Sequence, residues 1–129
     1  MNTPIRPAGI AGPAANYELA VTVTSDSRLL FTAGIVGTRP DGTIAADIGE
    51  QAAEMWRSVG VVLTAAGFAV ADIASYTTYA VVGNDLGAAM AARDLFFGDH
   101  RAASTLIPVP ALARSEWLVE VTVVAASRF

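Results

Sequence analysis

The chain has 129 residues, of which 53% are hydrophobic and 16% are charged, and its formal net charge is −4 at pH 7. This length is enough for one domain with its own core and too short for two ordinary domains. We therefore expect a single domain over residues 1–129. An apolar content this high in a small domain predicts that some apolar surface is buried between subunits.

The composition also excludes several kinds of site. The chain has no cysteine and one histidine, His100, which argues against disulfides, metal centres and cysteine or Ser-His-Asp catalysis. We expect neither a metal nor another cofactor. The acidic balance and the lack of a basic cluster argue against nucleic acid as a partner. We see no signal peptide, and the longest weakly polar stretch, residues 59–71, is too short to span a membrane. We expect no membrane partner and a cytoplasmic location.

The N-terminal third predicts strands. Residues 1–16 are rich in proline and glycine and indicate an extended lead-in. Strands are expected over 17–23 and 29–33, joined into a hairpin by turn residues at 25–27. The run from Arg39 through Pro40 and Asp41 to Gly42 predicts a tight turn.

The middle of the chain predicts a helix over residues 48–66. Asp47 is the expected N-cap and Gly67 the residue that ends the helix. Glu54 and Arg57 stand three positions apart on its polar side. An apolar stripe follows at steps of three and four, formed by Ile48, Ala52, Met55, Val59, Val62 and Ala66.

The remaining elements are a strand over 74–82, a helix over 86–97 ended by Gly98, and strands over 103–109 and 117–125. Pro108 and Pro110 favour an edge position or a bend for the strand over 103–109. The order β-β-α-β-α-β-β predicts an α+β fold, with one mixed sheet and both helices on one face. We expect the other face to be covered by the same face of further copies.

The last strand is the most strand-like segment of the chain and contains a carboxylate, Glu120. By alternation Leu118, Glu120, Thr122 and Val124 share a mixed face, whereas the face that begins at Trp117 is apolar and predicts core. An ionised carboxylate is costly to bury without a partner. Glu120 therefore either faces water or belongs to a site.

A series of short motifs runs along the whole chain. The motifs are Gly12-Pro13, Asn16-Tyr17, Leu30-Phe31-Thr32-Ala33-Gly34, Glu50-Gln51-Ala52, Ala66-Gly67, Asp72-Ile73, Asp94-Leu95-Phe96-Phe97, Leu112-Ala113-Arg114 and Glu116-Trp117-Leu118-Val119-Glu120-Val121. In this order and spacing they are similar to those of the RidA/YjgF-like reactive-intermediate deaminase family. The resemblance implies a chorismate-mutase-like fold, a homotrimer with clefts between subunits, and hydrolysis of reactive enamines and imines to ketones and ammonia.

The resemblance implies Glu120 and Tyr17 as catalytic residues, and both family positions are kept. It places Ala33 (with its neighbour Gly34), Met90 and Thr105 at the substrate. Ala33 stands where the family has a serine and Met90 where it has an asparagine. An ungapped count back from Glu120 puts Thr105 where the family has the arginine that binds a substrate carboxylate, a contact that threonine cannot make. The chain thus resembles a subgroup that handles a neutral or bulkier ligand rather than a simple 2-imino acid.

The residues assigned to the site also have simpler interpretations. Glu120 could pair with Arg101 or Arg114 at an interface, and Tyr17 could cover the edge of the core. Arg93 is expected to be a solvated helix charge, although Arg93, Arg101 or Arg114 could replace the missing guanidinium. His100 is expected at the surface.

Two functions follow as hypotheses. The first is a trimeric enzyme that hydrolyses or tautomerises a reactive enamine or imine, with Glu120 as proton relay. The second is a non-catalytic trimer that binds a metabolite as a sensor or interaction module. The ribonuclease activity attributed to some relatives fits poorly with the net charge of −4.

Overall fold

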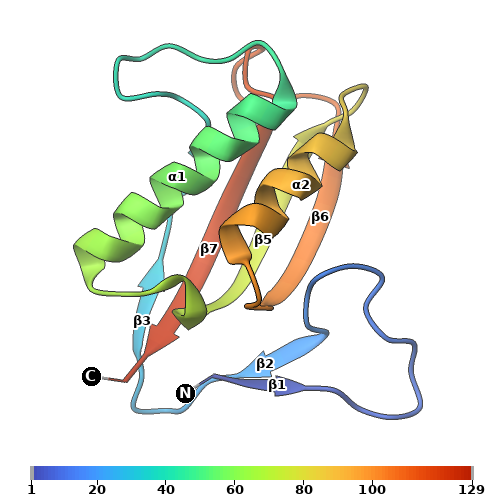
Figure 1. Ribbon diagram of the computed structural model, residues 1–129, viewed down its shortest axis with the longest axis vertical. Helices are drawn as coiled ribbons and strands as arrows, with labels where there is room; N and C mark the ends of the chain where they lie inside the picture. Colours follow the sequence, from blue (N-terminus) through green and yellow to red (C-terminus); the bar gives the residue numbers. More distant parts are fainter. Residues whose placement is uncertain (1, 129) are drawn as a thin grey trace.

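The computed structural model describes residues 2–128 and has two layers, a mixed sheet and two helices on one of its faces (Figure 1). The sheet order is β3-β7-β5-β6, and β4 also pairs with β7. Strands β5 and β6 are parallel and the other pairs are antiparallel. The α+β architecture expected from the sequence is therefore confirmed. The strands of this sheet are β3 (Arg28–Phe31), β4 (Ile35–Val36), β5 (Ile73–Val81), β6 (Ala103–Val109) and β7 (Val119–Ser127).

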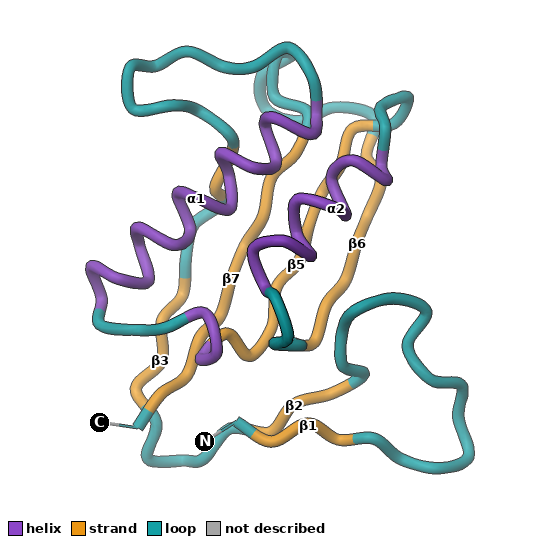
Figure 2. Tube along the Cα trace, in the orientation of Figure 1, coloured by secondary structure: helices purple, strands orange, loops and turns teal. Residues whose placement is uncertain are grey.

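Strand β7 lies at the centre of the sheet, between β3 and β4 on one side and β5 on the other (Figure 2). Val119, Val121, Val123 and Ala125 are at most 1% exposed and face the helices, as their alternation predicts. The strand begins two residues later than expected, because Trp117 is still in a turn in which its backbone N–H donates to Arg114 O.

Both helices have the bounds that their caps predict. Helix α1 (Ile48–Ala66) begins after Asp47, whose side chain accepts from Glu50 N, and ends at Gly67 in the left-handed conformation. Helix α2 (Leu86–Phe97) begins after Asp85 and ends at Gly98. A short 3-10 turn, η1 (Val70–Asp72), leads into β5. Between the helices and the sheet, the ring of Trp56 contacts the rings of Tyr76, Phe96 and Phe97.

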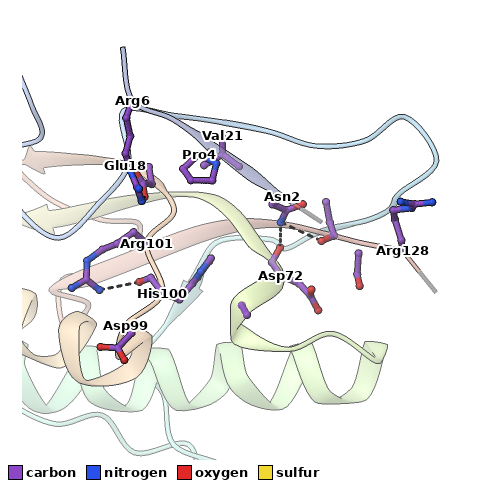
Figure 3. A pocket seen from close by; sticks show the side chains of 13 residues that line it. Asn2, Pro4, Arg6, Glu18, Val21, Asp72, Asp99, His100, Arg101 and Arg128 are labelled. Carbon is purple, nitrogen blue, oxygen red and sulfur yellow. Dashed lines mark hydrogen bonds and ion pairs between the residues drawn. The ribbon is translucent and has the colours of Figure 1, made fainter. Parts of the chain in front are cut away.

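A two-stranded hairpin, β1 (Thr3–Ile5) with β2 (Ala20–Thr22), lies beside one end of the main sheet. The expectation that residues 17–23 and 29–33 pair with each other is wrong, because β2 pairs with β1 and β3 pairs with β7. The extended N-terminal residues supply the partner for β2. One end of the hairpin is fastened by Asn2, whose Nδ2 donates to Asp72 O at 3.0 Å and to Ala126 O at 3.3 Å (Figure 3).

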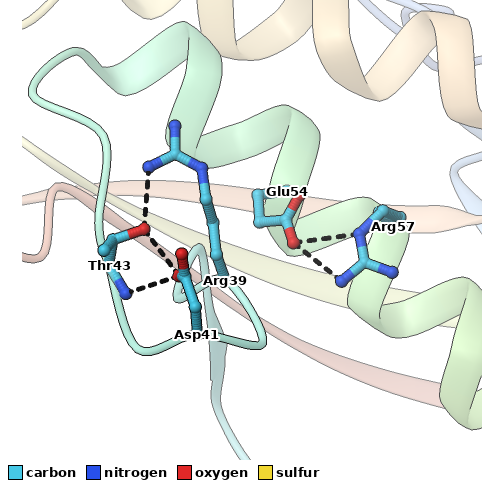
Figure 4. Close-up of polar contacts among 5 residues, drawn as sticks. All are labelled: Arg39, Asp41, Thr43, Glu54 and Arg57. Atoms are coloured by element: carbon cyan, nitrogen blue, oxygen red, sulfur yellow. Dashed lines mark hydrogen bonds and ion pairs between the residues drawn. The ribbon is translucent and has the colours of Figure 1, made fainter.

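The loop before α1 contains the predicted turn. Gly42, at φ +87°, donates its N–H to Arg39 O, and the Asp41 carboxylate accepts from the backbone and hydroxyl of Thr43 (Figure 4). The predicted pairing of Glu54 with Arg57 on α1 is also present, at 2.7 Å. Within residues 2–128, no helix combines the length and apolar character needed to cross a membrane.

Candidate functional site

Glu120 lies on the face of the sheet that the helices leave uncovered. Its register partners are Val36 on β4 and Tyr79 on β5, and Tyr79 is in turn opposite Ile107 on β6. Cross-strand partners project to the same side, so these four side chains form one row across the sheet. Glu120 is half-buried in a single chain. The carboxylate thus has apolar and aromatic neighbours and remains accessible.

An irregularity between β3 and β4 brings Gly34 to Glu120. Phe31 pairs with Val124 and Ile35 pairs with Val121, so four steps on one side match three on β7, as in a β-bulge. A Cβ built on Gly34 would lie 2.0 Å from Glu120 Oε2 and 2.7 Å from its Cδ. Ala33, next to Gly34, is exposed. The chain therefore brings Ala33, Gly34 and Glu120 together, and the absence of a side chain at Gly34 leaves room for the carboxylate.

A second row of hydroxyl groups lies beside the first. Thr105 is in register with Thr77, and Thr77 with Thr122, two residues from Glu120. Among the strand residues of the main sheet that face this side, Glu120 carries the one charge. The sequence reasoning did not select Thr77 and Tyr79. The alternation along β5 was the signal that could have identified them.

Tyr17 lies far from Glu120 within one chain. Glu18, the next residue, bridges to Ala103 at the start of β6, so this segment lies outside the edge strand. Three strand spacings, about 14 Å in total, separate it from β7. The Tyr17 hydroxyl accepts from Ala14 N at 3.1 Å. The two residues expected to be catalytic are thus not brought together inside one subunit.

Met90 lies on the helix-covered side of the sheet, opposite to Glu120. It lines a small cavity between α2 and the sheet together with Thr78, Arg93 and Ser104. Arg93 corrects an expectation, because it is 8% exposed rather than solvated. Its guanidinium donates to Asp94 Oδ1 at 2.9 and 3.0 Å and also bonds Tyr76. Burial raises the pKa of the Tyr76 hydroxyl, against the effect of its bonds with Ser104 and Arg93.

The other two arginines considered as partners of Glu120 are engaged elsewhere. Arg101 Nη1 donates to Gly98 O at 2.7 Å and to His100 O at 3.1 Å. Arg114 lies over the ring of Trp117, with 5.4 Å from its Cζ to the ring centre. Neither forms an ion pair among the described residues. With these contacts among the described residues, neither Arg101 nor Arg114 takes the place of the guanidinium that Thr105 lacks.

Comparison with known proteins places the chain in a family. Residues 9–127 match the family model described as endoribonuclease L-PSP. No curated protein matches the sequence. Among solved structures, YyfB of Yersinia pestis, described as a protein of unknown function of the Rid family, is 26% identical over 98% of both chains, with a TM-score of 0.84.

Two Escherichia coli proteins have the same fold. TdcF, solved with bound serine, is 25% identical, covers 98% of this chain and 99% of its own, and has a TM-score of 0.73. YjgF is 25% identical over 88% of this chain and 94% of its own, with a TM-score of 0.71. Together with the match to the family model over residues 9–127, these similarities show that the chain belongs to the endoribonuclease L-PSP family, the RidA/YjgF group of proteins.

Proposed function

We propose that this protein is a homotrimer that acts on a reactive enamine or imine in clefts between its subunits. Glu120 transfers the proton and Tyr17 supports the ligand. The observation that carries the proposal is the position of Glu120, a single carboxylate held against Gly34 on the uncovered face of the sheet. A carboxylate beside apolar and hydroxyl groups is suited to acid–base chemistry.

The chemistry requires one group that both accepts and donates a proton. For an imine, water adds to the carbon of C=N while Glu120 accepts a proton from the water and passes it to nitrogen, which gives a carbinolamine. Glu120 then accepts the proton of the new hydroxyl group and donates it to nitrogen as the C–N bond breaks, so the products are a ketone and ammonia. For an enamine, proton transfer to carbon first gives the imine, which is also the tautomerisation step. A positioned general acid–base of this kind contributes roughly 10²- to 10⁴-fold in rate.

The assignment to clefts between subunits is supported by the separation of the expected catalytic residues. Tyr17 lies outside β6 and Glu120 lies on β7, about 14 Å apart by strand spacing. A ligand that contacts both must bridge two copies, with Tyr17 from one and Glu120 from the other. The uncovered, partly apolar face supplies the surface on which copies can pack.

The charges on this face also favour a substrate that has no carboxylate group. A substrate carboxylate needs a guanidinium or an equivalent cation, and the main sheet offers Thr77, Thr105 and Thr122 around Glu120 instead. The anionic Glu120 would repel a carboxylate. We therefore assign a neutral imine or enamine, or its protonated iminium form, as the substrate rather than a simple 2-imino acid.

The test compares two kinds of substrate generated in the assay. 2-Iminobutanoate and 2-iminopropanoate are produced in situ, an acyclic N-unsubstituted imine without a carboxylate is generated separately, and ketone or keto-acid release is followed. Wild-type protein should accelerate hydrolysis of the neutral imine, and Glu120→Gln should reduce that rate roughly 10²-fold or more. Glu116→Gln, which removes the same charge at an exposed position, should leave it unchanged. Thr105→Arg should increase the rate at which the two 2-imino acids are hydrolysed.

The competing function is a non-catalytic trimer that binds a metabolite in the same clefts. It is favoured by Ala33 and Thr105, which replace two of the polar residues that the resemblance places at the substrate. No acceleration of any imine, together with a small molecule retained in the clefts after purification, would establish the binder. Equal rates for wild type and Glu120→Gln would remove Glu120 from the mechanism.

A further inference from the structure

A large cavity of the described chain lies under the β1–β2 hairpin, remote from Glu120. Its volume is about 620 Å³, within the range of small-molecule sites. The hairpin forms one wall with Asn2, Pro4 and Val21, and the end of β7 forms part of the other (Figure 3). Ala126 is six residues from Glu120 along β7, or about 20 Å. The cavity is therefore separate from the site proposed above.

The hairpin spans this cavity and is hydrogen-bonded to the rest of the fold at both ends. At one end Asn2 donates to Asp72 O and Ala126 O. At the other, Glu18 N donates to Ala102 O at 2.9 Å, and the Glu18 carboxylate accepts from Arg6. Because both fastenings join the hairpin to the body of the fold, the space between them is formed before any ligand arrives, which lowers the entropic cost of binding.

Charge inside the cavity is unevenly compensated. The lining contains three arginines and three acidic residues, but Arg6 is paired with Glu18 and Arg128 with Asp26, which lies outside the cavity. The three acidic residues of the lining are Glu18, Asp72 and Asp99.

The remaining charges differ in how they are satisfied. Asp72 Oδ2 accepts from Ala69 N at the start of η1, and Asp99 is exposed, so its charge is screened by solvent. Arg101 is half-buried and has no ion-pair partner among the described residues. It is the cation of this cavity that remains to be neutralised.

Arg101 also lies near the Glu18 carboxylate. Hydrogen bonding from Arg6 lowers the pKa of this carboxyl, and the charge of Arg101 lowers it further. The His100 ring is fixed by a 2.8 Å hydrogen bond between Nε2 and Ile73 O.

We propose that this cavity is a second ligand site, which binds a small molecule bearing a carboxylate or phosphate group through Arg101 beneath the hairpin. Nη1 of Arg101 already donates to Gly98 O and His100 O. Its Nε and Nη2 have no hydrogen-bond partner among the described residues and can donate two parallel hydrogen bonds to either group. The half-buried Ser127 hydroxyl lies in the same lining and is available to the body of the ligand.

The test uses inorganic phosphate and succinate as probes of the full-length protein, with tetramethylammonium as the cationic comparison. Amide signals are followed by two-dimensional NMR during each titration. Saturable shifts are expected at Asn2, His100, Arg101 and Ser127 with one or both anions, none with tetramethylammonium, and none at Gly34 or Glu120. A response to phosphate alone or to succinate alone distinguishes the two sources of the anionic group.

Three variants separate the site from general electrostatic attraction. Arg101→Gln should weaken anion binding at least ten-fold, whereas Arg114→Gln, the same charge change beside Trp117, should alter it less than two-fold. Ala71→Phe should fill the cavity and abolish binding with every charge intact. Equal effects of the two arginine variants, shifts centred on Gly34 and Glu120, or a second copy of the chain seated in the cavity would overturn the proposal.

Discussion

Gly34 and Glu120 illustrate how one missing side chain positions a functional group. Gly34 does not have a positive φ, so its backbone conformation would accept other residues. What requires glycine is the Glu120 carboxylate, which occupies the space where a Cβ would lie. The spacing of these residues in the sequence, 86 positions apart, gives no indication of this contact.

Gly34→Ala is expected to move the Glu120 carboxylate while leaving the fold nearly unchanged. The atoms in the way are the far end of a flexible side chain, so the free energy of unfolding should change by less than about 1 kcal/mol. A displacement on the order of 1 Å should reduce activity roughly 10²-fold. Urea unfolding and imine hydrolysis measure the two effects.

Gly60→Ala is the matched control for this substitution. Gly60 is inside α1, where an added Cβ would meet Phe96 at an ordinary 3.5 Å. Alanine there should stabilise the protein by about 0.5–1 kcal/mol with unchanged activity. If Gly34→Ala retained full activity, the contact with Glu120 would have no functional role.

Arg93→Leu should be clearly destabilising. The Arg93 guanidinium is 8% exposed and bonds Asp94 and Tyr76, so its removal should cost about 1–3 kcal/mol through the polar partners left behind. Arg57→Leu removes an exposed pair with Glu54 and should change stability by no more than about 0.5 kcal/mol. Equal shifts of the urea midpoint for both variants would contradict the buried role of Arg93.

At the scale of elements, helices and the hairpin differ in where their partners lie. The caps and apolar stripe of α1 are local, and the helix has the predicted bounds. The partner of β2 is instead a three-residue strand near the N-terminus, β1, whose residues carry little strand signal. The ion pair of Arg6 with Glu18 closes the loop between these two strands.

Glu18→Gln should destabilise the hairpin in a pH-dependent way. Arg6 lowers the pKa of Glu18 in the folded protein, so the stabilisation is fully present above the unfolded-state value, about 4.3. It is lost as the pH falls through the lower folded-state pKa. Urea unfolding at pH 7, 5 and 3.5 should give a difference between wild type and Glu18→Gln that shrinks only at the most acidic point.

The exposed Glu116 supplies the control for that measurement, because Glu116→Gln changes the same charge without breaking an ion pair of the described chain. Its stability should stay close to that of the wild type at pH 7. A Glu18→Gln difference that grows toward acid pH would show that the pair does not act in this way.

At the scale of the whole molecule, the sheet has one face packed on helices and one face without cover (Figure 1). Phe31 is 68% exposed on the second face, in register with Val124, and Ile107 is 39% exposed. An apolar sheet face of this kind needs a partner surface. The proposed trimer would supply it.

Phe31→Asp is therefore expected to dissociate the assembly. Wild-type protein should sediment with about three times the 13.3 kDa chain mass, and the variant should sediment as a single chain, since a buried unpaired charge opposes association. Leu95→Asp, at a position 86% exposed on α2, should leave the assembly intact. A wild-type monomer, or dissociation by Leu95→Asp alone, would contradict packing through the sheet face.

The sequence by itself determined the helices, most strands and the face on which Glu120 lies. These features depend on local caps, turn residues and the periods of 2 and 3.6 residues, which need no information from distant segments. The short strand β4 (Ile35–Val36) escaped detection because two residues are too few to show alternation.

Only the tertiary structure decided the pairing of β1 with β2, the burial of Arg93, and the contact of Gly34 with Glu120. It also placed Tyr17 and Met90 away from Glu120 within one chain. Each of these depends on which segments meet across the sheet. That choice is made by the packing of the whole chain, because strand pairing joins residues through space and leaves no periodic mark in either segment.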